Sequence, residues 1–159
     1  MLKTFFIVTF LLVISQPARA DITGKPFIVD GDTIAIAGQL IRLYGIDAPE
    51  NEQTCGTAEQ PWRCGQEAGF ALAYFVTSNW VTCIERGRAP DGELAAVCFA
   101  GGIGGPDLAR HQVANGWALA LPGVVDGYEA EQEAARGAGL GIWRAVFTPP
   151  WEWRRQQGR

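Results

Sequence analysis

The feature that most restricts the fold is a set of four cysteines, Cys55, Cys64, Cys83 and Cys98, behind an N-terminal export signal. Four cysteines in an exported domain indicate two disulfides, for which three connectivities exist. Cys55 and Cys64 enclose a short loop, whereas Cys83 and Cys98 lie in two strand-like segments that can face each other across a hairpin. We therefore predict the pairs 55–64 and 83–98. A zinc site is the alternative, but no C-x₂-C pair is present and His111 is the only histidine.

The first twenty residues have the features of a secretory signal peptide. Lys3 gives a positive start, an apolar run extends from Phe5 to Ile14, and Ala18-Arg19-Ala20 has the small-x-small form of a cleavage site. The apolar run is too short to cross a bilayer, which needs about 20 residues. We expect a periplasmic or secreted protein without a membrane span, whose mature part, residues 21–159, is one domain.

The charge of the chain argues against a general attraction to nucleic acid. The formal net charge is −4, and removal of Lys3 and Arg19 with the signal makes the mature chain more negative by two. An acidic protein is not steered toward a polyanion by its overall field. A polyanionic substrate therefore requires local capture, by a metal ion or by a few arginines.

The pattern of apolar residues predicts strands first and helices inserted afterwards. This order is typical of an α+β fold, here a small β-barrel with helices packed on it. The tail at residues 148–153 contains two prolines and is expected to be irregular, and Arg154, Arg155 and Arg159 are expected to form a solvated basic tail. The predicted strands are 27–30, 33–37, 40–46, 80–84, 94–99 and 117–121, and the predicted helices are 65–78, 107–115 and 126–136.

The residues that could bind a metal ion or a phosphate lie between Asp30 and Glu50. Asp30-Gly31-Asp32-Thr33 joins the first two predicted strands, Arg42 lies in the third, and Asp47-Ala48-Pro49-Glu50 ends it. Taken alone, the first segment is also compatible with a solvated hairpin turn. Because the two carboxylate groups lie at the ends of neighbouring strands, Asp32 and Asp47 can meet around a hard cation such as Ca²⁺. Arg42 can then present its forked donors to a phosphate.

At this point the chain resembles the staphylococcal nuclease (thermonuclease) family, and specifically its exported branch in Gram-negative bacteria. The resemblance covers about residues 22–154 and implies a five-stranded OB-type barrel with three helices. The segments that carry it are Val29-Asp30-Gly31-Asp32-Thr33, Ile41-Arg42-Leu43, Gly45-Ile46-Asp47-Ala48-Pro49-Glu50, Asn115-Gly116-Trp117-Ala118 and Gly141-Ile142-Trp143.

The resemblance also implies a catalytic site. Asp32, Asp47 and the main-chain carbonyl of Ala48 match the positions that bind Ca²⁺, although the family usually has threonine at the position of Ala48. Glu50 matches the residue that activates water, and Arg42 matches an arginine that binds phosphate. The implied reaction is metal-assisted hydrolysis of a phosphodiester in single-stranded nucleic acid or a similar polymer.

Two departures from the family pattern affect catalysis and binding. Glu93 stands where the family has a second arginine, a kind of residue worth about 10³- to 10⁵-fold in rate in phosphoryl transfer. The glutamate either points inward or is solvated at the hairpin tip, and Arg86 or Arg88 is an alternative source of the missing charge. The family's stacking tyrosines are replaced by Leu121-Pro122-Gly123.

Three functions from different classes therefore remain open for this chain, which we expect to be a monomer. The main prediction is an exported calcium-dependent nuclease that is weak or inactive because of Glu93. The first alternative is an OB-type binding module without hydrolysis. The second is an accessory role in exopolysaccharide biosynthesis, since some rhizobial proteins with the same resemblance are named for succinoglycan biosynthesis.

Overall fold

The computed structural model describes residues 21–124 and 127–158, so the predicted signal peptide lies outside the described residues. Within these ranges, no helix is long and apolar enough to cross a membrane. The elements are β1 (Ile22–Gly24), β2 (Phe27–Ile28), β3 (Thr33–Ile36), β4 (Gln39–Leu43), β5 (Ile46–Asp47), β6 (Cys55–Gly56), β7 (Pro61–Trp62), α1 (Cys64–Val76), β8 (Val81–Arg88), β9 (Leu94–Ala100), α2 (Leu108–Ala114), β10 (Leu119–Ala120), α3 (Glu129–Gly137), a 3₁₀ helix (Gly141–Arg144) and α4 (Pro150–Gln156).

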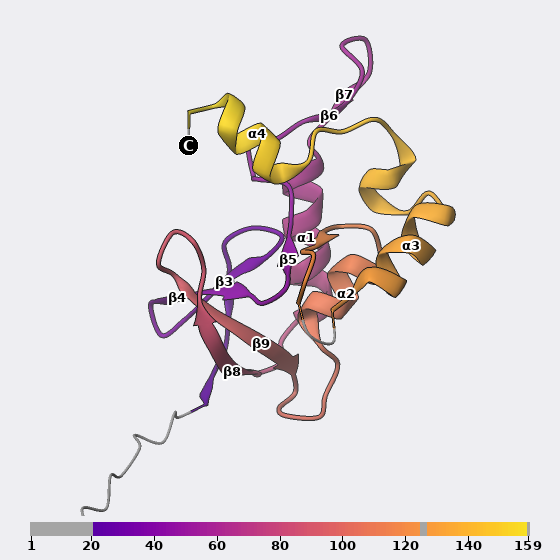
Figure 1. Cartoon of the computed structure of the whole chain (residues 1–159). Coiled ribbons are helices and arrows are strands. Elements are labelled where there is room, and N and C mark those ends of the chain that lie inside the picture. The colour runs from indigo at the N-terminus through magenta and orange to yellow at the C-terminus, as the bar shows by residue number, and fades with distance from the viewer. Residues whose placement is uncertain (1–20, 125–126, 159) are drawn as a thin grey trace, which may run out of the picture.

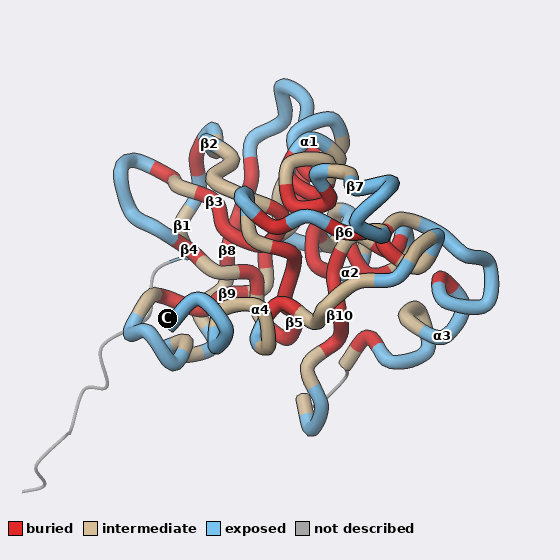
Figure 2. The backbone as a smooth tube through the Cα atoms, turned by 90° about the horizontal axis from the view of Figure 1, so that it is seen from above, coloured by how far each residue is buried: buried red, intermediate tan, exposed pale blue. Residues whose placement is uncertain are grey.

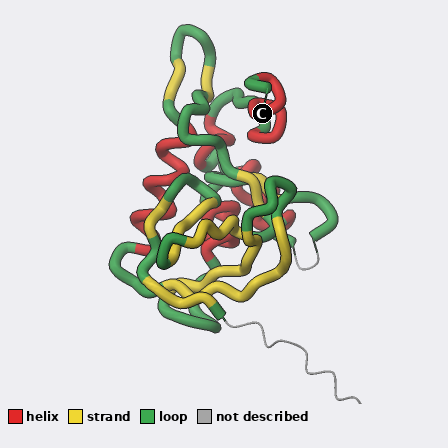
Figure 3. Tube along the Cα trace, turned by 90° about the vertical axis from the view of Figure 1, so that its left-hand side faces the viewer, coloured by secondary structure: helices red, strands yellow, loops and turns green. Residues whose placement is uncertain are grey.

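The main sheet has six strands in the order β1-β8-β9-β4-β3-β2. The pairing of β4 with β9 is parallel, and the other pairs in this sheet are antiparallel. The strands of this main sheet curl together in one half of the molecule and the helices pack beside them, while the β6–β7 pair lies apart from the sheet (Figures 1 and 3). The mixed α+β class predicted from the sequence is therefore confirmed.

The strand count and the sheet differ from the five-stranded OB-type barrel that the resemblance implied. The N-terminal segment contributes two strands, since β1 pairs with β8 at one edge while β2 pairs with β3 at the other. Only Lys25 and Pro26 separate them, and a proline cannot donate a hydrogen bond to a ladder. The two edge strands are consecutive in sequence but are not paired with each other, so the hydrogen-bonded ladder does not close into a barrel.

Both predicted disulfides are present, and the described residues contain no free cysteine. Cys83 and Cys98 are direct partners in the β8–β9 register, as the hairpin prediction required. The Cys55–Cys64 bridge joins the first residue of β6 to the first residue of α1. One bridge therefore lies inside the sheet and the other at the start of a helix.

Helix α1 packs on the sheet through Ala68, Leu72 and Val76, which are buried and recur at helical spacing. The buried core continues through the central strands and α2, whereas the outer faces of α1 and α4 are exposed (Figure 2). Helix α2 begins after Asp107, whose side chain accepts hydrogen bonds from the N–H groups of Ala109 and Arg110, as predicted.

The C-terminal tail is helical, which corrects the prediction of an irregular segment. Helix α4 begins at Pro150, where a proline is well tolerated because the first N–H groups of a helix have no internal partner. The structure thus has four α-helices in its described part instead of three. The predicted helix start at Asp126 lies outside the described residues, and α3 begins at Glu129.

Candidate functional site

The turn between β2 and β3 is held in shape by Asp30. The Oδ1 atom of Asp30 accepts hydrogen bonds from the N–H groups of Asp32 (3.0 Å) and Thr33 (2.7 Å). Gly31 packs so closely that a Cβ atom there would lie 2.8 Å from the Cβ atoms of Ala48 and Ala68. Only glycine therefore allows the turn to reach the segment that carries the second group of carboxylates.

A glutamine on α2 supports the same turn. The buried side chain of Gln112 donates from Nε2 to the carbonyl oxygens of Gly31 (2.8 Å) and Ala68 (3.0 Å). Because it links α2, α1 and the turn, this residue positions Asp32. The sequence offered no local signal for it, since the two bonds reach 81 and 44 residues along the chain.

Asp32 is buried and surrounded by donors. Its Oδ2 atom accepts from the Ala48 N–H (2.6 Å), and its Oδ1 atom accepts from the Thr33 hydroxyl (2.9 Å) and from Nη1 of Arg42 (3.4 Å). Burial raises the pKa of the Asp32 carboxyl well above its usual range, and the neighbouring Asp30 charge raises it further, while Arg42 lowers it. Asp32, Arg42 and Ala48 are thus neighbours, but Ala48 contacts Asp32 through its N–H, whereas the resemblance assigned its carbonyl oxygen to a metal ion.

Arg42 lies among three carboxylates. Besides Asp32, its Nη2 atom lies 3.1 Å from an oxygen of Asp91 and 3.5 Å from one of Glu93. The parallel pairing of β4 with β9 places the Asp91–Glu93 turn over this arginine. Glu93 therefore points toward Arg42, so the alternative of a solvated hairpin-tip glutamate is wrong.

Arg86 and Arg88 lie elsewhere on the same hairpin. Arg88 donates to the carbonyl oxygen of Gly92 (3.4 Å), and Arg86 lines a hollow of about 310 Å³ together with Asp107 and Tyr128. Neither position supplies a cation at the place where Glu93 meets Arg42.

The second half of the site is closed by Arg154 of helix α4. Its Nη1 and Nη2 atoms donate to both oxygens of Asp47 (2.8 and 2.7 Å), and Nη1 also donates to Glu50 (2.7 Å). The Asp47 side chain is only 5% exposed. The hydrogen bond to Asp47 is the largest cause of a raised Arg154 pKa, burial opposes it, and the bond to Glu50 adds to it. The prediction that Arg154 belongs to a solvated tail is wrong.

Sequence reasoning missed this contact because it joins residues 107 and 104 positions apart. The helix itself had a signal, since a proline at the first position followed by Glu152 in the first turn and arginines in the last turn is typical of a short helix. No pattern in the chain indicated which acidic residues that helix would meet. In the view of Figure 2, α4 lies beside β5, which carries Asp47.

The contacts of this cluster do not fit the predicted calcium site as they stand. Arg154 takes both oxygens of Asp47, and one oxygen of Asp32 accepts the Ala48 N–H. Among the described residues, no group of three or more carboxylate, cysteine or histidine side chains is arranged to hold a metal ion. Calcium takes six to eight oxygen ligands, and here both oxygens of Asp47 are already bonded to the Arg154 guanidinium.

The comparisons with known proteins place the chain in a family. No family model matches it. The chain is similar to the succinoglycan biosynthesis protein ExoI of Rhizobium meliloti (strain 1021), with 36% identity over 131 residues, which cover 80% of this chain and 68% of that protein. Identity at this level over most of both chains indicates common descent, and the chain belongs to the family of the succinoglycan biosynthesis protein ExoI.

Proposed function

We propose that this protein is an exported, non-hydrolytic component of exopolysaccharide biosynthesis. The biological role rests on its similarity to a protein named for succinoglycan biosynthesis. The two disulfides support export, since such bonds persist in oxidising compartments. The scaffold is proposed to derive from a staphylococcal-nuclease-like ancestor, on the strength of the motifs around Asp32 and Glu50 and of the strand-then-helix order.

The observation that carries the non-hydrolytic part of the proposal is the position of Arg154. A carboxylate that activates water must be able to accept a proton, and one that binds a metal must offer its lone pairs. Glu50 and Asp47 instead accept three short bonds from one guanidinium. Bidentate arginine–carboxylate pairs are among the strongest polar contacts in proteins, so this arrangement favours a structural role for the cluster.

Arg42 supports the same conclusion. A phosphate-binding arginine needs donors turned toward the ligand, but both Nη atoms of Arg42 face Asp32, Asp91 and Glu93, and its Nε atom, which has no hydrogen-bond partner among the described residues, is buried. Three neighbouring negative charges repel an approaching phosphate at close range. The cluster therefore disfavours binding of a phosphodiester at the place where the resemblance put it.

A deletion strain tests the biological role. We expect loss of the gene to lower the amount of exopolysaccharide, or to change its composition, and the wild-type gene to restore it. A Glu50→Gln gene should restore it equally, because the proposal gives Glu50 no role in hydrolysis. An unchanged polymer in the deletion strain would contradict the proposed role, and failure of Glu50→Gln to complement, despite normal protein levels, would contradict its non-hydrolytic nature.

A calcium-dependent phosphodiesterase is the second candidate, favoured by the convergence of Asp32, Arg42, Asp47 and Glu50 in one cluster. Purified mature protein is incubated with single-stranded DNA and calcium chloride. Our proposal predicts no cleavage above that of a Glu50→Gln control. The second candidate instead predicts slow cleavage that Glu93→Arg raises by roughly tenfold or more, by adding the missing cation.

A further inference from the structure

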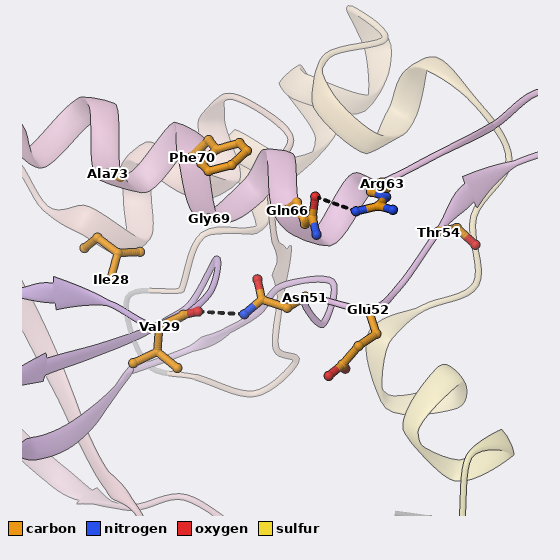
Figure 4. Close-up of a pocket in the computed structure, with 10 residues that line it drawn as sticks. All are labelled: Ile28, Val29, Asn51, Glu52, Thr54, Arg63, Gln66, Gly69, Phe70 and Ala73. Atoms are coloured by element: carbon orange, nitrogen blue, oxygen red, sulfur yellow. Dashed lines mark hydrogen bonds between the residues drawn. The ribbon is translucent and has the colours of Figure 1, made fainter.

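A second region of the molecule offers polar groups to open space. A groove of about 860 Å³ lies between β2, the loop that follows Glu50 and the outer face of α1 (Figure 4). This volume is within the range of binding sites for small molecules. The residues used below are Val29, Asn51, Arg63, Gln66, Gly69 and Phe70.

One wall of the groove is a single face of helix α1. Arg63, Gln66, Phe70 and Ala73 are spaced by three or four residues, so they share one side of the helix. Phe70 is 70% exposed on this otherwise polar or small face. Covering an exposed phenylalanine ring removes apolar surface from water, so Phe70 favours a ligand that can pack on its ring.

The opposite wall presents a fixed amide. Nδ2 of Asn51 donates to the carbonyl oxygen of Val29 (2.7 Å), which leaves Oδ1 as an acceptor on the groove side. Across the groove, Oε1 of Gln66 accepts from Arg63 (3.4 Å), which leaves Nε2 as a donor. In Figure 4 the Asn51 oxygen and the Gln66 nitrogen point into the space between the loop and the helix.

The floor is kept open by a glycine. A Cβ atom at Gly69 would lie 3.6 Å from the backbone of Asp30 and 3.8 Å from Oδ1 of Asn51, both ordinary contact distances. An alanine there is therefore compatible with the fold, and it would take up space in the groove. This provides a variant that changes the groove without removing a stabilising contact.

These groups fit a sugar chain better than the other ligand classes. A pyranose ring has an apolar C–H face, which an aromatic ring can cover, and a rim of hydroxyls that both donate and accept hydrogen bonds. A polyanion such as nucleic acid is disfavoured by the negative net charge of the chain, and the groove itself carries one acidic and one basic side chain, Glu52 and Arg63. A purely apolar ligand would leave the Asn51 and Gln66 groups without partners.

We propose that this groove binds a segment of the exopolysaccharide, with one sugar ring on Phe70 and its hydroxyls bonded to Asn51 and Gln66. The site rests on the proposed function for the identity of the polymer, and on the groove itself for the class of ligand. The protein would then act by holding the glycan chain, in a region separate from the arginine-closed cluster.

Calorimetric titration with oligosaccharides from partial hydrolysis of succinoglycan tests the site. We expect the mature protein to bind them and Phe70→Ala to weaken binding about tenfold, the equivalent of roughly 1.4 kcal/mol. Tyr74→Ala is the matched control, because Tyr74 is an 87% exposed aromatic on the same helix that does not line the groove. Its affinity should stay within about twofold of the wild type.

Gly69→Ala should weaken binding while leaving the melting temperature unchanged or higher, since alanine is the better helix former. Absence of oligosaccharide binding by the wild type, equal effects of Phe70→Ala and Tyr74→Ala, or binding of a single-stranded oligonucleotide in place of the sugar would each overturn the site. The genetic test separates this failure from that of the proposed function. If Phe70→Ala restores exopolysaccharide fully in the deletion strain, the groove assignment is wrong while the role in biosynthesis stands.

Discussion

The carboxylate–arginine cluster and the α1 groove lie on two sides of the same pair of chain segments, around Asp30 and Glu50, yet they treat polar groups in opposite ways. In the cluster, the carboxylates of Asp32 and Asp47 are almost fully buried and meet Arg42 and Arg154. In the groove, Asn51 and Gln66 each have one amide group engaged and the other facing open space.

This difference indicates that the two regions have different roles, one in stability and one in binding. A buried charge must be matched within the fold, because leaving it unpaired costs several kcal/mol, so carboxylates that already have guanidinium partners have little left for a ligand. Polar groups that face water keep their capacity to bind. The more heavily charged region therefore gives the fold its shape, and the less charged one is the better candidate for recognition.

The variant Arg154→Ala tests the structural role of the cluster most directly. Removing this arginine leaves the buried Asp47 carboxylate without its partner, so we expect a loss of about 3 kcal/mol in the free energy of unfolding. Denaturant titration of the mature protein measures it. Arg155→Ala is the matched control, since its 73% exposed side chain pairs with the exposed Glu152 and should matter by less than about 0.5 kcal/mol. Equal stability of the two variants would refute a structural role for Arg154.

Calcium adds a second readout on the same variant. If Arg154 holds the carboxylates closed, calcium should leave the melting temperature of the wild type unchanged and raise that of Arg154→Ala, because an ion that binds the native state stabilises it. The rise should disappear when Asp32→Ala is added. A calcium-dependent rise already present in the wild type would show that the ion displaces the arginine readily.

Removal of the Cys55–Cys64 bridge tests the role of the groove. The double variant Cys55→Ser, Cys64→Ser should lose about 2–3 kcal/mol of stability, as expected for a bridge that closes a short loop. Because the bridge ties the loop after Thr54 to the helix that follows Arg63, we also expect weaker oligosaccharide binding. The variant Cys83→Ser, Cys98→Ser is the comparator. At a temperature where both remain folded, it should lose similar stability but keep its affinity, and a reversed pattern would contradict the location of the site.

The smallest expected effect is that of Glu93→Gln. Arg42 keeps Asp32 and Asp91 as partners, and Glu93 is partly exposed at 3.5 Å, so unfolding should change by less than about 1 kcal/mol. Thermal denaturation at low and high salt measures this change. A loss of several kcal/mol would mean that Glu93, and not Asp32, is the main partner of Arg42.

Much of the framework follows from local patterns in the chain. The spacing of Ala68, Leu72 and Val76 predicts α1, and Asp107 predicts the start of α2, because both signals act within one or two helical turns. Cys83 and Cys98 could be paired because they flank a hairpin turn. The meeting of Asp32 with Arg42 was predictable for the same reason, since a hairpin register puts Thr33 opposite Arg42.

Other features were decided by tertiary structure alone. The split of the N-terminal strand between two edges, the buried bonds of Gln112 and the closure of Asp47 and Glu50 by Arg154 all join residues far apart in the chain. Sequence by itself determined which groups are present and how neighbouring ones are spaced. Whether Asp47 faces a metal ion, water or an arginine depends on where α4 packs, and that position is set by the summed contacts of the whole fold and not by any short motif.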